Sequence, residues 1–402
     1  MRVLINDHSG HNFTLSLSKY LASKGFQVFH CFSINFPSPK GYLSKGETDA
    51  DSLFLCPIAY DKRFKKYSLI NRSFQELEYG GKLNKIIKKE RPDIVICANT
   101  PLIAQQKILF YCKKMNIQFV YWCQDLYGVA IRNIVKKKLG LCGLIFSMPF
   151  EYLERYQLRK ASAIVAITED FKIKIENWGI KSNIKVIQNW NSIDDILLGP
   201  KENNFSRTWG IQDSFNIIYS GTLGLKHNPN LILQLSKKLN AVSNVKIIVI
   251  SEGIGAEYLY DEKEKLDLNN LIILPFQPFE VFSLVLSSAN ILLALLEKNA
   301  GTYSVPSKIL SYLCAGKPII IAAPFDNLAS KIVRESESGR WVDCDDTSEL
   351  ATAVIDIMNN KNLEKLFSEN ARKYAEKNFK IEVIGKKFEL LIEEVYKKIN
   401  YE

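Results

Sequence analysis

The stretch "AGTYSVPSKILSYLCAGKPIII" (300–321) combines a polar loop, a short helix and an apolar strand. Pro306 suits the first turn of the helix, because a helix makes no use of the amide that proline lacks there, and the neighbouring serines can cap that turn. Gly316 marks the end of the helix, and the apolar run after it reads as a buried strand. A helix followed directly by such a strand is typical of a parallel α/β sheet.

The same alternation of strand and helix runs through the chain twice. The first series places strands at 2–6, 26–32, 93–99, 117–125, 162–168 and 184–190. The second series starts again after a polar segment at 191–214, with strands at 215–221, 245–253, 270–276, 289–296 and 316–323. Alternation of this kind predicts two Rossmann-like α/β domains with a cleft between them. Ligands of such sheets bind beyond the carboxyl ends of the strands.

The charge of the chain is concentrated in its first half. The 402 residues carry a formal net charge of +10, and residues 1–195 hold 29 Lys or Arg against 17 Asp or Glu. This excess is either a set of solvated lysines or a surface for an anionic partner. The scattered cysteines predict free thiols in a reducing compartment. No apolar run reaches the roughly 20 residues of a membrane span, and the N-terminus lacks a signal-peptide pattern.

Three loops at predicted strand ends carry groups that suit an anion. Gly10 lies between a strand and a helix, where a glycine lets the backbone approach a ligand. The segment "YSGTLGLKHNPN" (219–230) has two glycines and Lys226 before a helix. The opening stretch brings Ser304, Val305, Ser307 and Lys308 to the start of its helix. Each loop alone is also explained by an ordinary turn, but their order along the chain suits a nucleotide diphosphate.

These residues resemble glycosyltransferase family 4, whose members have the two-domain GT-B fold. The resemblance is carried by "DHSGHNFTLSLSKYLASKGFQV", "VYWCQDLYG", "IKVIQNWNS", "IIYSGTLGLKHNPNLIL" and "VPSKILSYLCAGKPII", and it spans nearly the whole chain. It is nearest to the transferases of bacterial colanic acid, O-antigen and capsule assembly. The resemblance implies an acceptor-binding domain at 1–195, a nucleotide-sugar donor domain at 196–380, and a final helix at 381–402 that packs back on the first domain.

The family also implies roles for individual residues. Gly10, Gly221, Thr222, Lys226, Ser304, Val305, Ser307 and Lys308 would surround the donor diphosphate. Asp125 would be the polar group near the acceptor hydroxyl, although a helix cap or loop salt bridge explains it equally well. Phe276 and Gln277 would contact the base. The implied reaction retains the anomeric configuration, with UDP as the expected nucleotide and with neither a metal nor a cofactor.

The chain departs from the family at its two donor glutamates. Counting back from Gly316, these positions hold Tyr303 and Ser311, neither of which is a carboxylate. Glu297, at the end of the preceding strand, is the nearest carboxylate in sequence. We expect Glu297, Tyr303 and Ser311 to be the groups that hold the ribose and the sugar.

The resemblance implies an anionic membrane surface as the partner of the basic first half. Acceptors in these pathways are often carried on a lipid diphosphate, and the segment "RNIVKKKLGLCGLIFSMPF" (132–150) mixes lysines with apolar residues as membrane-surface segments do. The expected location is therefore cytoplasmic, on the inner face of the cell membrane. One alternative is another GT-B enzyme, such as a nucleotide-sugar 2-epimerase. A second is a non-enzymatic anion-binding protein, but no nucleic-acid-binding motif is present and nucleic acid is not expected as a partner.

Overall fold

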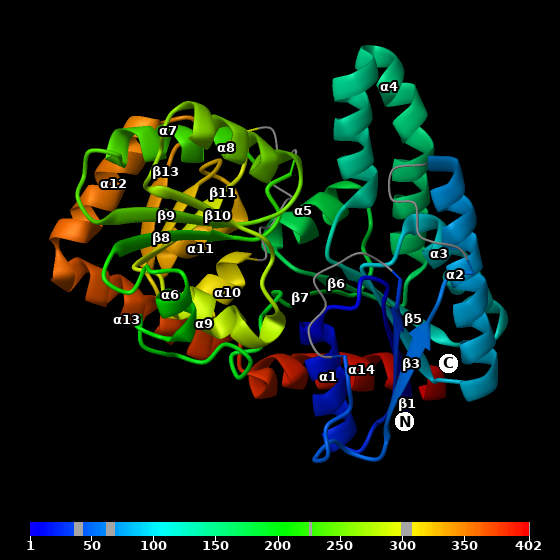
Figure 1. Ribbon diagram of the computed structural model, residues 1–402. Helices are drawn as coiled ribbons and strands as arrows, with labels where there is room; N and C mark the ends of the chain where they lie inside the picture. The colour runs from blue at the N-terminus through cyan, green and yellow to red at the C-terminus, as the bar shows by residue number, and fades with distance from the viewer. Residues whose placement is uncertain (36–42, 62–68, 225–226, 299–307, 402) are drawn as a thin grey trace. The chain divides into compact units, whose positions relative to one another are not determined.

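The computed structural model describes residues 1–35, 43–61, 69–224, 227–298 and 308–401, and these form two compact units. The N-terminal unit consists of Met1–Trp190 together with Ile381–Glu402, and the C-terminal unit consists of Asn191–Lys380. Each unit is a parallel sheet with helices on its faces (Figure 1). Two Rossmann-like units confirm the fold class predicted from the alternating pattern.

The sheet of the N-terminal unit has seven strands in the order β3-β2-β1-β4-β5-β6-β7. Its strands are β1 (Arg2–Asp7), β2 (Gln27–Ser33), β3 (Leu53–Ile58), β4 (Ile94–Ala98), β5 (Gln118–Cys123), β6 (Ala163–Ala166) and β7 (Ile184–Val186). Its helices are α1 (Asn12–Ser23), α2 (Leu69–Glu90), α3 (Leu102–Lys114), α4 (Tyr127–Lys160), α5 (Glu169–Asn177) and α14 (Ile381–Tyr401). The central strands are almost wholly buried, as expected for a sheet covered on both faces.

The sheet of the C-terminal unit has six strands in the order β10-β9-β8-β11-β12-β13. They are β8 (Phe215–Ser220), β9 (Val245–Ile250), β10 (Leu271–Leu274), β11 (Ile291–Leu295), β12 (Ile319–Ala322) and β13 (Gly339–Val342). The helices are α6 (Asn204–Thr208), α7 (Pro229–Leu239), α8 (Ile254–Lys265), α9 (Phe282–Ser287), α10 (Lys308–Cys314), α11 (Leu328–Glu335), α12 (Thr347–Asn359) and α13 (Lys361–Asn378), with the 3-10 turn η1 (Phe279–Val281) before α9. Buried aliphatic side chains of β8, β9, α7 and α12 form one continuous core.

The last helix, α14, packs on the N-terminal unit. Its Phe388 is fully buried, and the Phe388 ring centre lies 4.6 Å from that of Trp122, which stacks on Trp190. On the neighbouring helix α1, the hydroxyl of Tyr20 donates to Glu389 over 3.3 Å. The chain therefore returns to its first unit after completing the second, as the predicted fold requires.

Candidate functional site

In each sheet the chain first adds strands on one side of a starting strand and then continues on its other side. In the N-terminal unit this strand is β1, which pairs with β2 on one side and β4 on the other. In the C-terminal unit it is β8, which pairs with β9 and β11. Ligands of open α/β sheets bind at the carboxyl end of such a strand, because the flanking connections leave on opposite faces there. The carboxyl ends of β1 and β8 are therefore the two candidate ligand sites.

The chain leaves β8 at Gly221 in a conformation that favours glycine. Gly221 has φ +129°, and its amide donates to the carbonyl of Ile250 over 3.0 Å. A Cβ atom built on Gly221 would lie 3.5 Å from Nζ of Lys308. Thr222 follows, and its carbonyl accepts from the Tyr219 hydroxyl over 2.8 Å. The structure thus brings together Gly221, Thr222 and Lys308, three of the residues predicted to hold the donor.

Lys308 places a buried cation at the end of β8. It is the first residue of α10, and its Nζ lies 3.6 Å from the centre of the Tyr219 ring. The Nζ atom is buried and has no hydrogen-bond partner among the described residues. Burial lowers the pKa of Lys308 to about 7, because a buried ammonium loses its hydration without gaining a counter-charge. An anion bound beside Gly221 would supply that charge.

Helix α10 is anchored to the end of β8 by Tyr312. The Tyr312 hydroxyl accepts from the amide of Ser220 over 3.0 Å and lies 3.2 Å from the carbonyl oxygen of Leu293. The residue before it, Ser311, is also buried, and its Oγ accepts from the side-chain amide of Asn191 over 2.6 Å. Ser311 thus already has a partner, and a contact between it and a ribose stays a prediction.

The loop after β8 rests on the start of α8. The amide of Leu223 donates to Ser251 Oγ over 3.0 Å, and a Cβ atom on Gly255 would lie 2.4 Å from the Leu223 carbonyl oxygen. The "G-x-G" of residues 253–255, which does not complete a dinucleotide motif, therefore has a packing role. Gly255 lets the loop that carries Gly221 and Thr222 lie directly on α8.

The predicted base contacts lie beside an open depression of about 490 Å³. The depression is lined by Ser251, Glu252, Gly253, Ala256, Glu257, Tyr260, Asp261, Ile273, Leu274 and Pro275. Phe276 follows β10, is 45% exposed, and donates its amide to Glu252 over 3.1 Å. Gln277 donates its side-chain amide to the carbonyl of Pro275. Glu297 lies just beyond the end of β11 and is half-buried.

Five of the predicted donor residues lie outside the residues that the structure describes. They are Lys226, Tyr303, Ser304, Val305 and Ser307. Their roles stay predictions.

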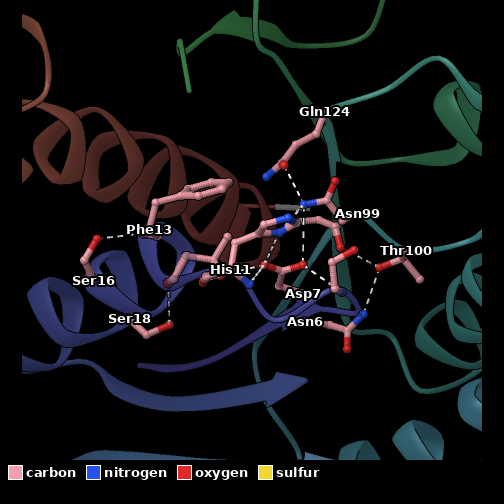
Figure 2. A network of polar contacts seen from close by, with 12 residues as sticks. Asn6, Asp7, His11, Phe13, Ser16, Ser18, Asn99, Thr100 and Gln124 are labelled. Atoms are coloured by element: carbon pink, nitrogen blue, oxygen red, sulfur yellow. Dashed lines mark hydrogen bonds and ion pairs between the residues drawn. The ribbon is translucent and has the colours of Figure 1, made fainter. Parts of the chain in front are cut away.

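The other candidate site is the end of β1, where a buried carboxylate organises the β1–α1 loop (Figure 2). Asp7 is fully buried and accepts from the amide of His11 over 2.8 Å and from Thr14 Oγ1 over 2.8 Å. His11 Nδ1 lies 3.1 Å from Asp7 Oδ2, and the His11 side chain is 33% exposed. Gly10, with φ +71°, closes the turn by donating its amide to the carbonyl of Asp7.

Two neighbouring strands add amide side chains to this loop. Asn99 follows β4 and donates from Nδ2 to Gln124 Oε1 over 2.5 Å, and Gln124 follows β5. Asn99 Nδ2 also lies 3.4 Å from Asp7 Oδ1, and the residue has the left-handed φ of +45°. Figure 2 shows Asp7, His11, Asn99 and Gln124 gathered at one edge of the sheet. We call these four residues the β1-end network.

Charge is balanced inside the β1-end network. Burial alone would raise the pKa of Asp7, but the charge and hydrogen bonds of His11, with help from Thr14, hold that pKa well below its usual range. Burial acts in the opposite direction on His11 and would lower its pKa. The charge and hydrogen bond of the Asp7 carboxylate outweigh this, so that the pKa of His11 is raised. Asp125, the predicted acceptor-side residue, is exposed after β5 and adds to this rise. The arrangement therefore favours the charged form of His11 at the carboxyl end of the sheet.

Sequence reasoning missed all four residues of the β1-end network. It selected Gly10 and Asp125, but not Asp7, His11, Asn99 or Gln124. A signal was present, since the chain has only four histidines and two of them, His8 and His11, lie in this one loop. The partners from β4 and β5 could be found only from the strand order.

Two family descriptions match the chain, one for each half. The description "Glycosyltransferase Family 4" matches residues 10–194, and "Glycosyl transferases group 1" matches residues 201–374. The chain therefore belongs to the glycosyltransferases that combine these two domains. A curated relative, an uncharacterized glycosyltransferase of Methanocaldococcus jannaschii, is 24% identical over 244 residues. That match covers 58% of this chain and 59% of the relative.

Solved structures with the same fold are glycosyltransferases of the GT-B type. HepE of Anabaena, in complex with UDP and glucose, is 14% identical with a TM-score of 0.69, covering 98% of this chain and 99% of its own. Sucrose-phosphate synthase of Thermosynechococcus elongatus is 13% identical with a TM-score of 0.76, covering 99% and 100%. A glycosyltransferase of Rickettsia africae is 17% identical with a TM-score of 0.71, covering 98% of both chains.

Proposed function

We propose that the protein transfers a sugar from a UDP-sugar to a glycan acceptor, with retention of anomeric configuration. The observation that carries the proposal is the buried Lys308 ammonium beside Gly221, at the point in the C-terminal sheet where ligands bind. A buried cation without a partner is costly, and a diphosphate would relieve that cost while Lys308 stabilises the charge. UDP is favoured because HepE, a structure with this fold, is described in complex with UDP and with UDP-glucose.

In this reaction the bond between the anomeric carbon and the diphosphate oxygen breaks, and a bond to an acceptor oxygen forms. The acceptor hydroxyl loses its proton, and the diphosphate leaves with additional negative charge. Lys308 lies where it would stabilise that charge as it develops. The exposed Asp125 and the imidazole of His11 supply polar groups for an acceptor at the carboxyl edge of the N-terminal sheet. We propose that these steps need no metal, and metal independence stays a prediction.

The acceptor that we propose is a glycan on a lipid diphosphate, in the assembly of a bacterial surface polysaccharide such as an O-antigen or capsule. The support is the excess of Lys and Arg in residues 1–195 and the resemblance of the chain to transferases of those pathways. The protein would then act at the cytoplasmic face of the membrane. Among the described helices, none is long and apolar enough to cross a membrane, so the proposal is attachment to the surface.

Calorimetric titration with UDP, GDP, dTDP and ADP tests the donor part of the proposal. We expect selective binding of UDP, and a loss of about 10- to 100-fold in UDP affinity for Lys308→Met, because a charge-assisted contact is removed. The matched control is Lys317→Met. Lys317 is also half-buried with a pKa lowered by burial, but it precedes β12 and so lies at the opposite edge of the same sheet. Unchanged UDP binding in Lys308→Met would contradict the proposal.

A further inference from the structure

Helix α4 of the N-terminal unit is a hairpin of two helical limbs that extends beyond the rest of that unit (Figure 1). Gly140, with φ +58°, makes the turn between limbs at 127–139 and 141–160. At two glycines, the backbone of one limb lies directly against the backbone of the other. A Cβ atom on Gly143 would lie 2.4 Å from the Val135 carbonyl oxygen, and one on Gly128 would lie 2.8 Å from the Glu151 Cα. The hairpin is therefore a tightly packed projection.

The inner face of the second limb is polar. Ser147 and Glu154 are buried there, and Glu154 accepts from the amide of Gly128 over 3.0 Å. Glu151, one turn before Glu154, pairs with Arg132 of the first limb at 3.2 Å. Burial raises the pKa of Glu154 to about 8, despite its backbone hydrogen bonds. The contact between the limbs thus depends on polar groups and backbone packing.

The outer face of the second limb is apolar and open. Ile145, Met148 and Tyr152 are 69%, 64% and 69% exposed, and Phe146 beside them is 66% exposed. Residues 145, 148 and 152 follow one another at helical spacing, so they form a single stripe along the helix. We call these three side chains, together with the adjacent Phe146, the apolar stripe. A helix with its polar groups inside and its large apolar groups outside is arranged for an environment other than water.

The charge of the hairpin identifies that environment. Residues 127–160 contain seven Lys or Arg and only two acidic residues, Glu151 and Glu154. Glu151 pairs with Arg132 and Arg155, and Glu154 is buried, whereas Lys136 is exposed on the first limb. The exposed surface of the hairpin therefore combines large apolar side chains with uncompensated positive charge. A protein partner does not require this combination, but the headgroups and acyl chains of an anionic lipid layer match both components.

We infer that the α4 hairpin attaches the protein to an anionic membrane surface by inserting the apolar stripe into the headgroup layer. The inference deepens the proposed function, on which it rests for the presence of a lipid-borne acceptor. Insertion removes four exposed apolar side chains from water, and the lysine-rich first limb adds attraction to anionic headgroups. The apolar stripe belongs to the α4 hairpin, which is part of the folded N-terminal unit. Attachment through it needs no membrane-spanning segment.

Sedimentation with vesicles of phosphatidylglycerol and of phosphatidylcholine tests the inference on the full chain. We expect binding to phosphatidylglycerol vesicles that weakens with salt, and weaker binding to phosphatidylcholine. The double variant Ile145→Ser/Met148→Ser should bind at least about tenfold less, because two inserted side chains are lost. The control is Ile173→Ser/Leu366→Ser, which changes two exposed apolar side chains on α5 and α13 and should bind like the native protein.

Equal binding of the native protein and the α4 double variant would overturn the inference, as would absence of binding by the native protein at low salt. A dimer in solution that Ile145→Ser/Met148→Ser dissociates, without vesicle binding, would instead assign the stripe to contact between copies. UDP titration of each variant separates this inference from the proposed function. If UDP fails to bind while the vesicle results hold, only the donor proposal falls.

Discussion

The Nζ atom of Lys308 lies 3.6 Å from the centre of the Tyr219 ring, beside Gly221 and without a hydrogen-bond partner among the described residues. The ring faces the ammonium with its electron-rich side, which offers partial compensation for lost hydration. That compensation is incomplete, because burial still lowers the pKa of Lys308 to about 7. The cation is thus positioned before any ligand arrives, and the ligand supplies the missing charge.

This position predicts that UDP binding takes up a proton. The free Lys308 is partly neutral above pH 7, whereas the diphosphate favours its charged form and raises its pKa. UDP affinity should therefore fall as the pH rises, by about 10- to 50-fold between about pH 7 and pH 9. Calorimetry in buffers of different ionisation enthalpy measures the proton uptake directly. In Lys308→Arg, which stays charged, both effects should disappear. The same pH slope in the variant would assign the titration to another group.

Gly255 should determine where the loop after β8 lies. In Gly255→Ala the new Cβ would lie 2.4 Å from a backbone carbonyl oxygen, that of Leu223, which cannot rotate away. We expect a loss of about 1–3 kcal/mol in the free energy of unfolding, together with weaker UDP binding, since Gly221 and Thr222 belong to the displaced loop. Urea unfolding and UDP titration measure the two effects.

Gly224 provides the control for this substitution within the same loop. Among the described residues, a Cβ atom there would meet nothing closer than Thr222 Cγ2 at 3.7 Å, which is an ordinary contact. Gly224→Ala should therefore leave stability nearly unchanged. Equal stability of Gly255→Ala and the native protein would show that α8 can move away without cost.

The Asp7–His11 pair should give stability a defined pH dependence. The pKa of His11 is raised in the folded protein, so its contribution is fully present below about pH 6.5 and is lost as the pH rises through the folded value. The pKa of Asp7 is lowered, so its contribution is present above about pH 3.8 and is lost as the pH falls. The pair therefore stabilises the fold most between these limits.

His11→Gln tests this dependence. We expect it to cost about 1.5–3 kcal/mol near pH 5.5, where the ion pair is complete, and clearly less near pH 9. Urea unfolding of both proteins at the two pH values gives the comparison, and Asp7→Asn should abolish the raised pKa of His11 in an NMR titration. A cost that is the same at both pH values would mean that His11 acts as a neutral hydrogen-bonding group.

The alternation of strands and helices was sufficient to predict both sheets, because buried parallel strands are continuous apolar runs. Two edge strands were missed for physical reasons. Strand β3 contains Pro57, which only an edge strand tolerates, and β13 is four residues long and begins with Gly339. The part of α4 before residue 150 was missed because Gly140, Gly143 and Pro149 interrupt its helical pattern. The structure shows that Gly140 makes a turn and Gly143 a close helix contact.

The two candidate sites also differ in how far the sequence alone could predict them. Gly221, Thr222 and Lys308 belong to motifs with local spacing, so the sequence alone was enough to predict them. Their meeting at the end of β8 follows from α10 lying against that strand, where Tyr312 anchors it. The β1-end network joins residues 7, 99 and 124, which only the strand order β1-β4-β5 brings together. A single sequence carries no local pattern that identifies such a group.

The contact between α14 and α1 should be set by Gly385. A Cβ atom on Gly385 would lie 2.2 Å from Cδ1 of the Tyr20 ring, and the Tyr20 hydroxyl is itself bonded to Glu389. Gly385→Ala should therefore cost about 1–3 kcal/mol in the free energy of unfolding, because the ring has to leave its place. Tyr20→Ala should reduce that cost by opening the space.

A double-mutant cycle with Gly385→Ala and Tyr20→Ala measures this coupling. We expect the double variant to be more stable than the sum of the single effects predicts, by about 0.5–3 kcal/mol. Tyr20→Phe is the control, since it keeps the ring and removes only the hydroxyl, and it should not relieve the cost of Gly385→Ala. Additive effects of Gly385→Ala and Tyr20→Ala would show that α14 does not press on Tyr20, and that its place on the N-terminal unit depends on other contacts, such as that of Phe388 with Trp122.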